Sequence, residues 1–458
     1  MSYDEAVRYL LTLGKELAAP RQARVQKFDL ANITALAEYL GSPHCASPCA
    51  HIAGTNGKGS TAAMLDSILR AAGLRTGLYT SPHLERINER IRIGGKEISD
   101  SHFASSFARI EEAIETMLAS GALAAHPTYF ECLTAMAFDA FARAEMDFTV
   151  YEVGMGGRLD ATNIVTPEVA LITQIDFDHE DYLGHSIDEI AAEKAGIIKP
   201  GGWVASAAER PEARAVIARR AATLDARLIE IDTAYRVSNL RSDTGRYSAT
   251  VSSAHSSKTI SLELPLFGRF QVRNAVTALA AARLLAERGF PVDDDAIARG
   301  IASVKWPGRL EPLSERPAVY LDGTHNPAGA RELLAFWEEQ FTGRKIVLVY
   351  GAMRDKAVDE IAGQLFPRAS TVIFTEPQQA RAISARALAE MTGHLARKFE
   401  VVSGPASALE RAIESARPED VVFATGSLYL VGDLRSYWKR RSSAEQACVA
   451  SAHPAKRT

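Results

Sequence analysis

The stretch HIAGTNGKGSTAAMLDSILRAAG, residues 51–73, decides the fold of the first half of this chain. An apolar strand is predicted over Cys49–Ala53, and it runs into the glycine-rich loop GTNGKGS. Apolar residues at helical spacing then predict a helix over Thr61–Ala72, which Gly73 terminates. A loop between a strand and the N-terminus of a helix is a place where backbone N–H groups and the helix dipole hold phosphate. The sequence therefore predicts a phosphate-binding loop, with Lys58 as its cation.

The loop departs from the strict P-loop pattern in two places. Ile52 stands where the pattern has its first glycine, and Gly59 stands where a serine or threonine should follow the lysine. A glycine-rich turn that binds nothing would have the same composition. The strand before the loop and the helix after it favour phosphate binding. The degenerate pattern and the lack of a base-recognition motif argue against a GTPase or an ATPase motor.

Strands and helices alternate through most of residues 1–307. Strand-like runs occur at Thr76–Thr80, Phe148–Val153, Val169–Ile175 and Trp203–Ser206, and helical patterns at Tyr3–Leu17, Leu30–Leu40, Glu131–Ala144, Ile187–Ala195 and Asn274–Arg288. The alternation predicts a parallel sheet with helices on both faces. Residues 226–266 interrupt it with β-branched residues and polar turns, which predict a small antiparallel subsheet.

A second α/β series begins after Trp306-Pro307-Gly308-Arg309, where proline and glycine stop the preceding element. Its strands are expected at Val319–Leu321, Ile346–Tyr350, Thr371–Phe374 and Val421–Ala424, and its helices at Ala328–Gln340, Val358–Leu365, Ala385–Thr392 and Leu430–Trp438. We therefore expect one domain over 1–307 and a smaller Rossmann-like domain, without a GxGxxG motif, over 308–440. Residues 441–458 are small and polar, and a disordered tail is predicted there.

The composition excludes several classes of protein. The 458 residues carry a formal net charge of −4, so no basic excess points to nucleic acid. The first residues do not show the basic segment followed by an apolar block that is typical of a signal peptide. No apolar run is long enough to span a membrane. Cys45 and Cys49 are followed by no second pair at zinc-ligand spacing. We expect a cytoplasmic protein, a monomer that binds small molecules.

Polar residues follow three other predicted strands. Glu152 ends one strand and precedes a run with three glycines, and His179 closes the sequence DFDH after the next strand. Strands consecutive in sequence are often neighbours, so Glu152 and His179 are expected close together. A carboxylate there suits the hard cation that accompanies a nucleotide. The sequence DGTHNP, residues 322–327, follows a strand of the second domain, where Pro327 is expected to open a helix.

Taken together, these segments resemble the Mur-ligase-like superfamily and, within it, the folylpolyglutamate synthase/dihydrofolate synthase family. The matching stretches are HIAGTNGKGS, YTSPHLERINERI, TYFE, YEVGMGGRLDATN, DFDHEDYLG, EKAGIIKPG, FGRFQVRNA, WPGRLE, LDGTHNP and ATGSLYLVGD, in order from residue 51 to residue 433. The resemblance implies a P-loop-type ATPase domain that binds ATP and a pterin, followed by a glutamate-ligase domain. Joining glutamate to dihydropteroate or to folates would then proceed through an acyl phosphate, with ATP and two magnesium ions.

The resemblance also implies roles for single residues. ATP would be held by Thr55, Asn56, Gly57, Lys58, Gly59, Ser60, Asn274, Arg309 and Asp322. Magnesium would be held by Ser81, Glu152 and His179, and by Lys194 as a carbamate, which requires a partly neutral amine. The pterin pocket would comprise Thr128, Tyr129, Phe130, Glu131, Leu159, Asp160 and Ala161, and the incoming glutamate would meet Arg90, His325 and Ser427. Lys58, Lys194 and His325 would be the catalytic residues.

One stretch departs from the family pattern. The family often has Gly-Leu-Glu-Arg in its second N-terminal helix, whereas this chain has Asn32 at the arginine position, and Arg21 or Arg24 is a candidate to compensate. Thr128 and Glu131 could also simply begin a helix. The alternatives are therefore a folylpolyglutamate synthase alone, a Mur-type ligase for another carboxylate, and a non-catalytic nucleotide-binding module. The last would be expected to lack Glu152, His179 or DGTHNP, and this chain has all three.

Overall fold

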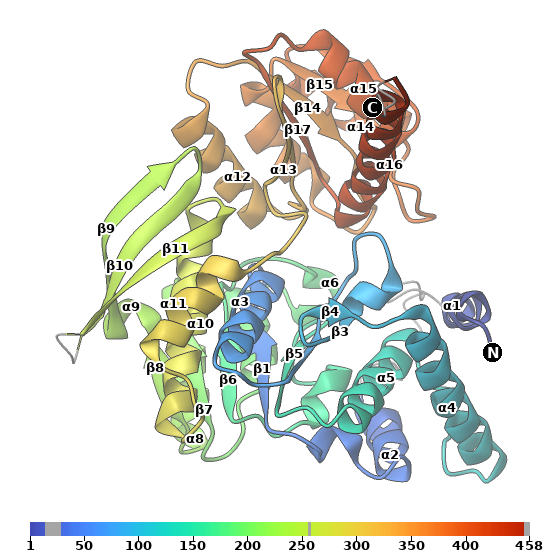
Figure 1. Cartoon of the computed structure of the whole chain (residues 1–458), viewed down its shortest axis with the longest axis vertical. Helices are drawn as coiled ribbons and strands as arrows, with labels where there is room; N and C mark the ends of the chain where they lie inside the picture. Colours follow the sequence, from blue (N-terminus) through green and yellow to red (C-terminus); the bar gives the residue numbers. More distant parts are fainter. Residues whose placement is uncertain (14–28, 255–257, 453–458) are drawn as a thin grey trace, which may run out of the picture. The chain divides into compact units, whose positions relative to one another are not determined.

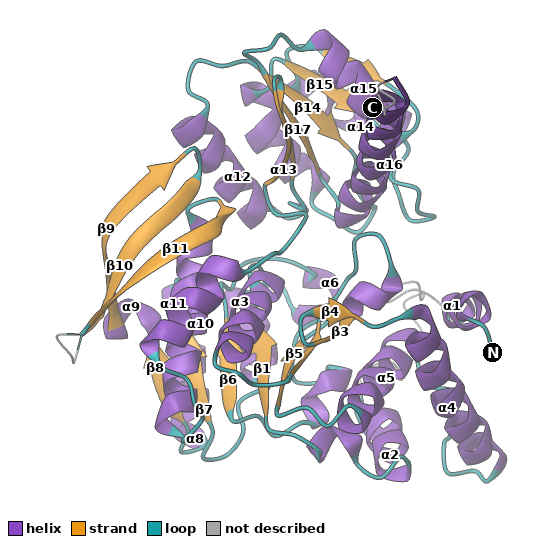
Figure 2. Cartoon of the chain, in the orientation of Figure 1, coloured by secondary structure: helices purple, strands orange, loops and turns teal. Residues whose placement is uncertain are grey.

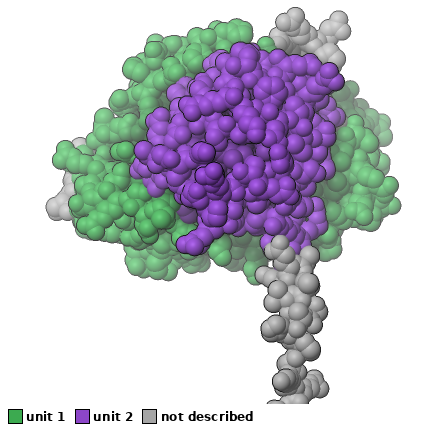
Figure 3. Space-filling model, turned by 90° about the horizontal axis from the view of Figure 1, so that it is seen from above, with its two compact units in different colours: residues 1–265, 269–305 green, residues 266–268, 306–458 purple. Residues whose placement is uncertain are grey.

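The computed structural model describes residues 1–13, 29–254 and 258–452. The chain forms two compact units (Figure 3). The first comprises residues 1–265 and 269–305, and the second comprises residues 266–268 and 306–458. The main division, between Lys305 and Trp306, lies two residues before the predicted boundary after Pro307. Among the described residues, no helix combines the length and the apolar character needed to cross a membrane.

The first unit is built on an eight-stranded sheet of order β4-β3-β2-β5-β1-β6-β7-β8 (Figures 1 and 2). Its strands are β1 Cys49–Ala53, β2 Thr76–Tyr79, β3 Ile91–Ile93, β4 Lys96–Glu97, β5 Phe148–Glu152, β6 Val169–Ile172, β7 Trp203–Ser206 and β8 Arg227–Glu230. From β2 to β8 all neighbours pair in parallel, and only β3 and β4 pair antiparallel. The predicted parallel α/β architecture is confirmed.

The helices of this unit fill the connections between strands. They are α1 Tyr3–Thr12, α2 Ala31–Tyr39, α3 Lys58–Ala71, α4 Asp100–Ala119, α5 Tyr129–Arg143, α6 Glu180–Leu183, α7 Ile187–Ala195, α8 Pro211–Thr223, α9 Ile231–Ala234, α10 Phe270–Glu287 and α11 Asp294–Ser303. Helices α4 and α5 pack on the sheet face that carries Tyr79 and Tyr151. Helices α3 and α10 lie side by side (Figure 1). Strand β1 is buried along its whole length, as a central strand covered on both faces must be.

The predicted antiparallel subsheet is also present. Strands β9 Tyr235–Asp243, β10 Arg246–Ser253 and β11 Thr259–Phe267 form a three-stranded sheet of order β11-β10-β9. Alternate residues of β10 and β11 are buried, which is the period-two pattern of a sheet with one covered face.

The second unit contains a six-stranded sheet of order β12-β13-β17-β14-β15-β16. Its elements are β12 Glu311–Glu315, β13 Ala318–Leu321, α12 Pro327–Gln340, β14 Ile346–Tyr350, α13 Val358–Leu365, β15 Thr371–Phe374, α14 Ala385–Thr392, β16 Phe399–Val401, α15 Pro405–Ser415, β17 Val421–Thr425 and α16 Leu428–Ala452. Only β12 pairs antiparallel to its neighbour. The Rossmann-like prediction is confirmed.

Two predictions on the ends of the chain need comment. Helix α1 is described only as far as Thr12, so the last residues of the helix predicted to Leu17 lie outside the described residues. The prediction of disorder from residue 441 is corrected for residues 441–452, which continue α16. Alanine, the best helix former, is frequent there, and Glu445 and Gln446 are also good helix formers, so a polar and small composition did not exclude a helix.

Candidate functional site

Four neighbouring strands of the first unit end beside one another. In the order β2-β5-β1-β6, Ser81 follows the first strand, Glu152 ends the second, the glycine loop follows the third and His179 follows the fourth. The carboxyl ends of parallel strands meet at one edge of a sheet, where α/β proteins bind ligands. The expectation that the strands of Glu152 and His179 are neighbours is wrong, because β1 lies between them. Their ends are thus about 10 Å apart, two strand spacings, with the glycine loop between.

The glycine loop has the geometry of an anion site. Gly57, with φ of 85°, is the N-cap of α3, and the first bond of the helix runs from the Thr61 N–H to the Gly57 carbonyl at 2.9 Å. The helix therefore begins at Lys58, three residues before its predicted start. The N–H groups of Lys58, Gly59 and Ser60 precede that first bond and have no acceptor within the helix. They are the groups that a phosphate would meet.

Two lysines converge on the carbonyl of Gly54. Lys58 Nζ donates to the Gly54 and Thr55 carbonyl oxygens at 3.0 and 3.1 Å, and Lys194 Nζ donates to Gly54 O at 2.9 Å. Lys194 is 3 % exposed. Burial, and then the neighbouring charge of Lys58, lower the pKa of Lys194 to about 7. The partly neutral amine that a carbamate requires is therefore present at neutral pH.

Thr55 and Asp176 tie the loop to the DFDH segment. The Thr55 hydroxyl donates to the Asp176 carbonyl at 2.9 Å and accepts from its N–H at 3.1 Å, so this side chain holds the loop itself. The Asp176 carboxylate accepts from Arg210 at 2.9 Å, and the Arg210 guanidinium lies over the Phe177 ring at 5.4 Å. Asn56 accepts from the Thr173 hydroxyl through its carbonyl at 2.7 Å. No motif had pointed to Arg210.

The proposed metal ligands have suitable chemistry. Glu152 is 4 % exposed and accepts from the Ser81 N–H at 3.1 Å. His179 has φ of 53°, a rare left-handed conformation, and its ring lies 3.8 Å from the Asp178 carboxylate. The described residues contain no group of three or more His, Cys, Asp or Glu side chains close enough to hold a metal. A single carboxylate with a hydroxyl and an imidazole still fits magnesium, which usually takes few protein ligands and completes its shell with water and phosphate.

A buried polar chain links α10 to the loop. Asn274 Nδ2 donates to Gln271 Oε1 at 2.9 Å, and Gln271 Nε2 donates to Ser60 Oγ at 3.4 Å. Asn274 was predicted as a nucleotide residue, whereas Gln271 was missed. Its place three residues before Asn274, on the same helix face, is the signal that could have revealed it.

Phe130, one of the residues expected at the pterin pocket, lies against Gly154. A Cβ on Gly154 would lie 2.5 Å from the Phe130 ring, so the glycine lets that ring approach the backbone. Arg90, 2 % exposed, donates from Nε to His83 Nδ1 at 2.9 Å, and its guanidinium lies over the Tyr129 ring at 5.5 Å.

Three of the polar side chains expected at the pterin pocket are already hydrogen-bonded to nearby backbone groups. Thr128 and Glu131 form a capping box at the start of α5, in which the Thr128 N–H donates to Glu131 Oε2 at 2.7 Å. The Asp160 carboxylate accepts from the N–H groups of Met155 at 2.9 Å and Thr162 at 3.0 Å. The helix-start alternative thus holds for Thr128 and Glu131, and Asp160 shapes the glycine-rich turn, with half-exposed Leu159 and buried Ala161 beside it.

The departure near the N-terminus is only partly described. Asn32 lies in the first turn of α2, which the Asp29 side chain supports by accepting from the Ala31 N–H at 2.9 Å. Arg21 and Arg24 lie outside the described residues.

In the second unit, the predicted residues follow the neighbouring strands β13 and β17. Asp322 accepts from the N–H of Leu310 at 2.9 Å and of Thr324 at 3.0 Å, so it fixes the segment that carries Arg309. His325 Nδ1 lies 2.8 Å from the Gly323 carbonyl oxygen. Ser427 accepts from the Tyr429 N–H at 3.1 Å, at the start of α16.

Family models match most of the chain. Residues 52–282 match the Mur ligase middle domain, and residues 308–428 match the Mur ligase glutamate ligase domain. A dihydrofolate synthase/folylpolyglutamate synthase of Mycobacterium tuberculosis is 39% identical over 80% of this chain and 77% of its own length. A probable bifunctional folylpolyglutamate synthase/dihydropteroate synthase of Halobacterium salinarum is 39% identical over 96% of this chain, which spans about half (52%) of that relative.

Solved structures agree with these matches. The folylpolyglutamate synthase of Mycobacterium tuberculosis, complexed with ADP and AMPPCP, superposes with a TM-score of 0.85 and 35% identity, covering 94% of this chain and 99% of its own. A bifunctional folylpolyglutamate synthase/dihydrofolate synthase of Yersinia pestis, complexed with AMPPNP and Mn, gives a TM-score of 0.81 and 33% identity, covering 96% and 98%.

Proposed function

The chain belongs to the folylpolyglutamate synthase/dihydrofolate synthase family of Mur-type ligases, and we propose that it joins L-glutamate to dihydropteroate, to reduced folate polyglutamates or to both, converting ATP to ADP and phosphate. The family resemblance of the motifs is confirmed by the matches over both units. The observation that carries the proposal is the loop before α3, where Lys58 and Lys194 meet the Gly54 carbonyl beside the strand end of Glu152.

The reaction needs an activated carboxyl group, because a carboxylate is a poor electrophile. An oxygen of the substrate carboxylate attacks the γ-phosphorus of ATP, ADP leaves, and an acyl phosphate forms. The α-amine of glutamate then attacks the acyl carbon, loses a proton and displaces phosphate, which gives the new amide. Lys58 and the N–H groups that open α3 stabilise the charge on the transferring phosphoryl group.

Ser81, Glu152 and His179 would hold a magnesium ion at this edge of the sheet. When bound, the ion supplies positive charge that neutralises the nucleotide phosphates. The Ser81 N–H orients the Glu152 carboxylate before any ion arrives, since it already donates to Oε2.

Lys194 is proposed to carry a carbamate that serves a second ion. The ammonium form first loses one proton, and the neutral Nζ then forms a bond to the carbon of CO₂ and releases a second proton, so a cation is replaced by a carbamate anion. A pKa of about 7 makes roughly half of the amine available for this step at pH 7.

The remaining predicted residues are assigned to the substrates. Asn274 and Arg309 are proposed to contact ATP, and Asp322 to act by holding the Arg309–Leu310 segment. Arg90, His325 and Ser427 are assigned to glutamate. Phe130 and Tyr129 offer rings for stacking on a pterin.

Release of phosphate in the presence of ATP and Mg²⁺ tests the proposal. Dihydropteroate and tetrahydrofolate polyglutamate are each supplied with and without L-glutamate. We expect glutamate-dependent release with at least one of them. Release with tetrahydrofolate alone would identify a folylpolyglutamate synthase only, and release with dihydropteroate alone a dihydrofolate synthase only. Activity solely with another carboxylate, such as a UDP-linked acid, would overturn the folate assignment.

A further inference from the structure

Helix α10 presents two buried amides to the phosphate loop. Gln271 is 0 % exposed and Asn274 is 9 % exposed, and they stand three residues apart on one face of the helix. Buried amides are costly unless they are hydrogen-bonded. Here the bonds form a chain, because Asn274 Nδ2 donates to Gln271 Oε1 at 2.9 Å, and Gln271 Nε2 in turn donates to Ser60 Oγ at 3.4 Å.

This chain of bonds couples the directions of the two amides. Since Gln271 Oε1 accepts from Asn274, the Gln271 nitrogen faces Ser60 and the Asn274 nitrogen faces Gln271. The Asn274 oxygen is therefore the end that meets the loop. Its Oδ1 lies 2.4 Å from where a Cβ on Gly57 would be, so only glycine leaves room for it. Without Gln271, nothing in this chain of bonds would keep the Asn274 amide from turning over.

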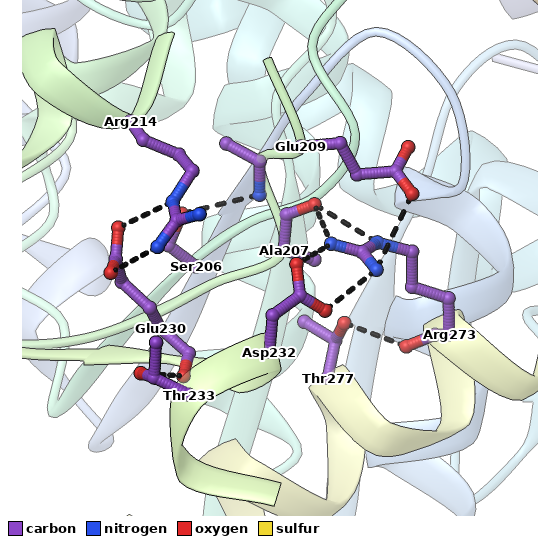
Figure 4. Close-up of polar contacts among 10 residues, drawn as sticks. Ser206, Ala207, Glu209, Arg214, Glu230, Asp232, Thr233, Arg273 and Thr277 are labelled. Atoms are coloured by element: carbon purple, nitrogen blue, oxygen red, sulfur yellow. Dashed lines mark hydrogen bonds and ion pairs between the residues drawn. The ribbon is translucent and has the colours of Figure 1, made fainter. Parts of the chain in front are cut away.

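Other residues hold α10 in place independently of Gln271. Figure 4 shows Arg273 bridging to Asp232 at 2.7 and 2.8 Å and to the Ala207 carbonyl oxygen at 2.9 and 3.1 Å. The Thr277 hydroxyl donates to the Arg273 carbonyl at 2.8 Å. The Arg273 bonds fasten the helix to the segment after β7 and to α9, whereas the Thr277 bond lies within the helix. The loss of the Gln271 amide should thus leave the helix where it is.

We propose that Gln271 is a positioning residue for nucleotide binding, which fixes the Asn274 amide and the Ser60 hydroxyl for ATP. The inference rests on the proposed function, in which Asn274 and Ser60 contact ATP. A turned Asn274 amide would offer an N–H where the bound nucleotide meets an acceptor. Losing one such bond should weaken ATP binding about tenfold, while the fold is retained.

A double-mutant cycle on ATP affinity tests this positioning. Titration calorimetry with ATP and Mg²⁺, without folate or glutamate, is run on the full chain and on Gln271→Met, Asn274→Ala and the double variant. Gln271→Leu repeats the test with a different apolar shape, and Thr277→Val is the matched control, buried on the same helix. Thermal unfolding without nucleotide reports whether each variant folds.

We expect Gln271→Met and Gln271→Leu to weaken ATP binding about tenfold, and Thr277→Val to bind like the unmodified chain. Gln271→Met should add less than about twofold when Asn274 is already alanine, because the effect passes through Asn274. ATP affinity unchanged in folded Gln271→Met, or an equal loss in both backgrounds, would overturn the inference alone. Failure of the unmodified chain to bind ATP, or no effect of Asn274→Ala, would overturn the proposed nucleotide site and the inference with it.

Discussion

The loop after β1 in the first unit and the loop after β13 in the second both follow a buried strand and both open a helix, but their backbones are satisfied in opposite ways. In the first loop, lysine ammonium groups bind the carbonyl oxygens of Gly54 and Thr55. In the second, the side chains of Asp322 and Asn326 accept from the N–H groups of Thr324 and Gly329. In the first loop, side-chain donors thus bind carbonyl oxygens at the start of a helix, whereas in the second loop side-chain acceptors bind N–H groups.

The comparison predicts its largest effect at Lys58. Lys58→Met removes the cation beside the N–H groups of α3, so kcat should fall about 100- to 1000-fold, as for the loss of a group that stabilises the transition state. Steady-state assays of phosphate release measure this. Arg309→Met, beside the second loop, is the counterpart and should chiefly raise the KM for ATP. A Lys58→Met enzyme with kcat within about threefold of the unmodified chain would break the comparison.

The next effect is a pH dependence of stability. Burial lowers the pKa of Lys194 to about 7, whereas a lysine in the unfolded chain has a pKa near about 10.4. Between these values the unfolded chain binds more protons, so the free energy of unfolding should rise with pH by up to about 1.4 kcal/mol per pH unit. Below about pH 7 the lysine is charged in both states and the contribution is constant.

Urea unfolding in CO₂-free buffer between about pH 7 and 9.5 measures the slope. Lys194→Met should remove most of the rise, while Lys96→Met, at an exposed position, should keep it. Equal slopes in the unmodified chain and Lys194→Met would show that this ammonium is not strained by its burial.

The second loop should respond to Asp322 through stability. Asp322→Ala leaves the N–H groups of Leu310 and Thr324 without their acceptor, which should lower the free energy of unfolding of the second unit by about 1–3 kcal/mol. Chemical denaturation, followed by a signal from the second unit, is the measurement. Asp355→Ala, which loses only a partly exposed ion pair with Arg381, should change stability by less than about 0.5 kcal/mol. Similar losses in both variants would contradict the role given to Asp322.

The smallest effect is expected at the N-cap of α12. The Asn326 side chain accepts from the Gly329 N–H at 2.8 Å. Asn326→Ala should therefore lose about 1 kcal/mol of stability, and Asn326→Ser, which keeps an acceptor, should lose less. Thermal unfolding of the two variants measures the difference. If the alanine variant were more stable than the serine variant, the Asn326 cap would not stabilise α12.

Short apolar runs bounded by breakers were predicted accurately. Helix α7 and strand β7, and β14 with α13 in the second unit, begin and end where the sequence places them, because glycine, proline or polar turns flank each run. Helix α3 begins three residues before its predicted start. Glycine and serine favour loops, so Gly59 and Ser60 were assigned to the loop, although they lie in the first turn of the helix.

The order of the strands, and the residues that support the predicted site residues, could not be predicted from the sequence. The insertion of β1 between β5 and β6 depends on pairing between distant segments. Gln271 and Arg210 are hydrogen-bonded to Asn274 and Asp176, and no local pattern of the sequence encodes these contacts. Thr128, Glu131 and Asp160 were predicted to line the pterin pocket because their motifs match the family. In the structure, their side chains are hydrogen-bonded to nearby backbone groups.

Gly54 bears on which sequences evolution can reach from this one. A Cβ there would lie 1.8 Å from the Thr173 hydroxyl oxygen, and the residue has φ of 154°. Shortening Thr173 to alanine would remove the hydroxyl contact, but the Thr173 Cβ at 3.0 Å and N at 3.2 Å would stay close, and the backbone angle is one that side-chain-bearing residues rarely adopt. In either order, the step that replaces Gly54 is strained, because the backbone angle at position 54 does not depend on Thr173. Substitution at position 54 is therefore opposed both by the contact with Thr173 and by the backbone angle. At exposed Gly41, an added Cβ would meet no atom within 4 Å, so only the backbone angle opposes substitution.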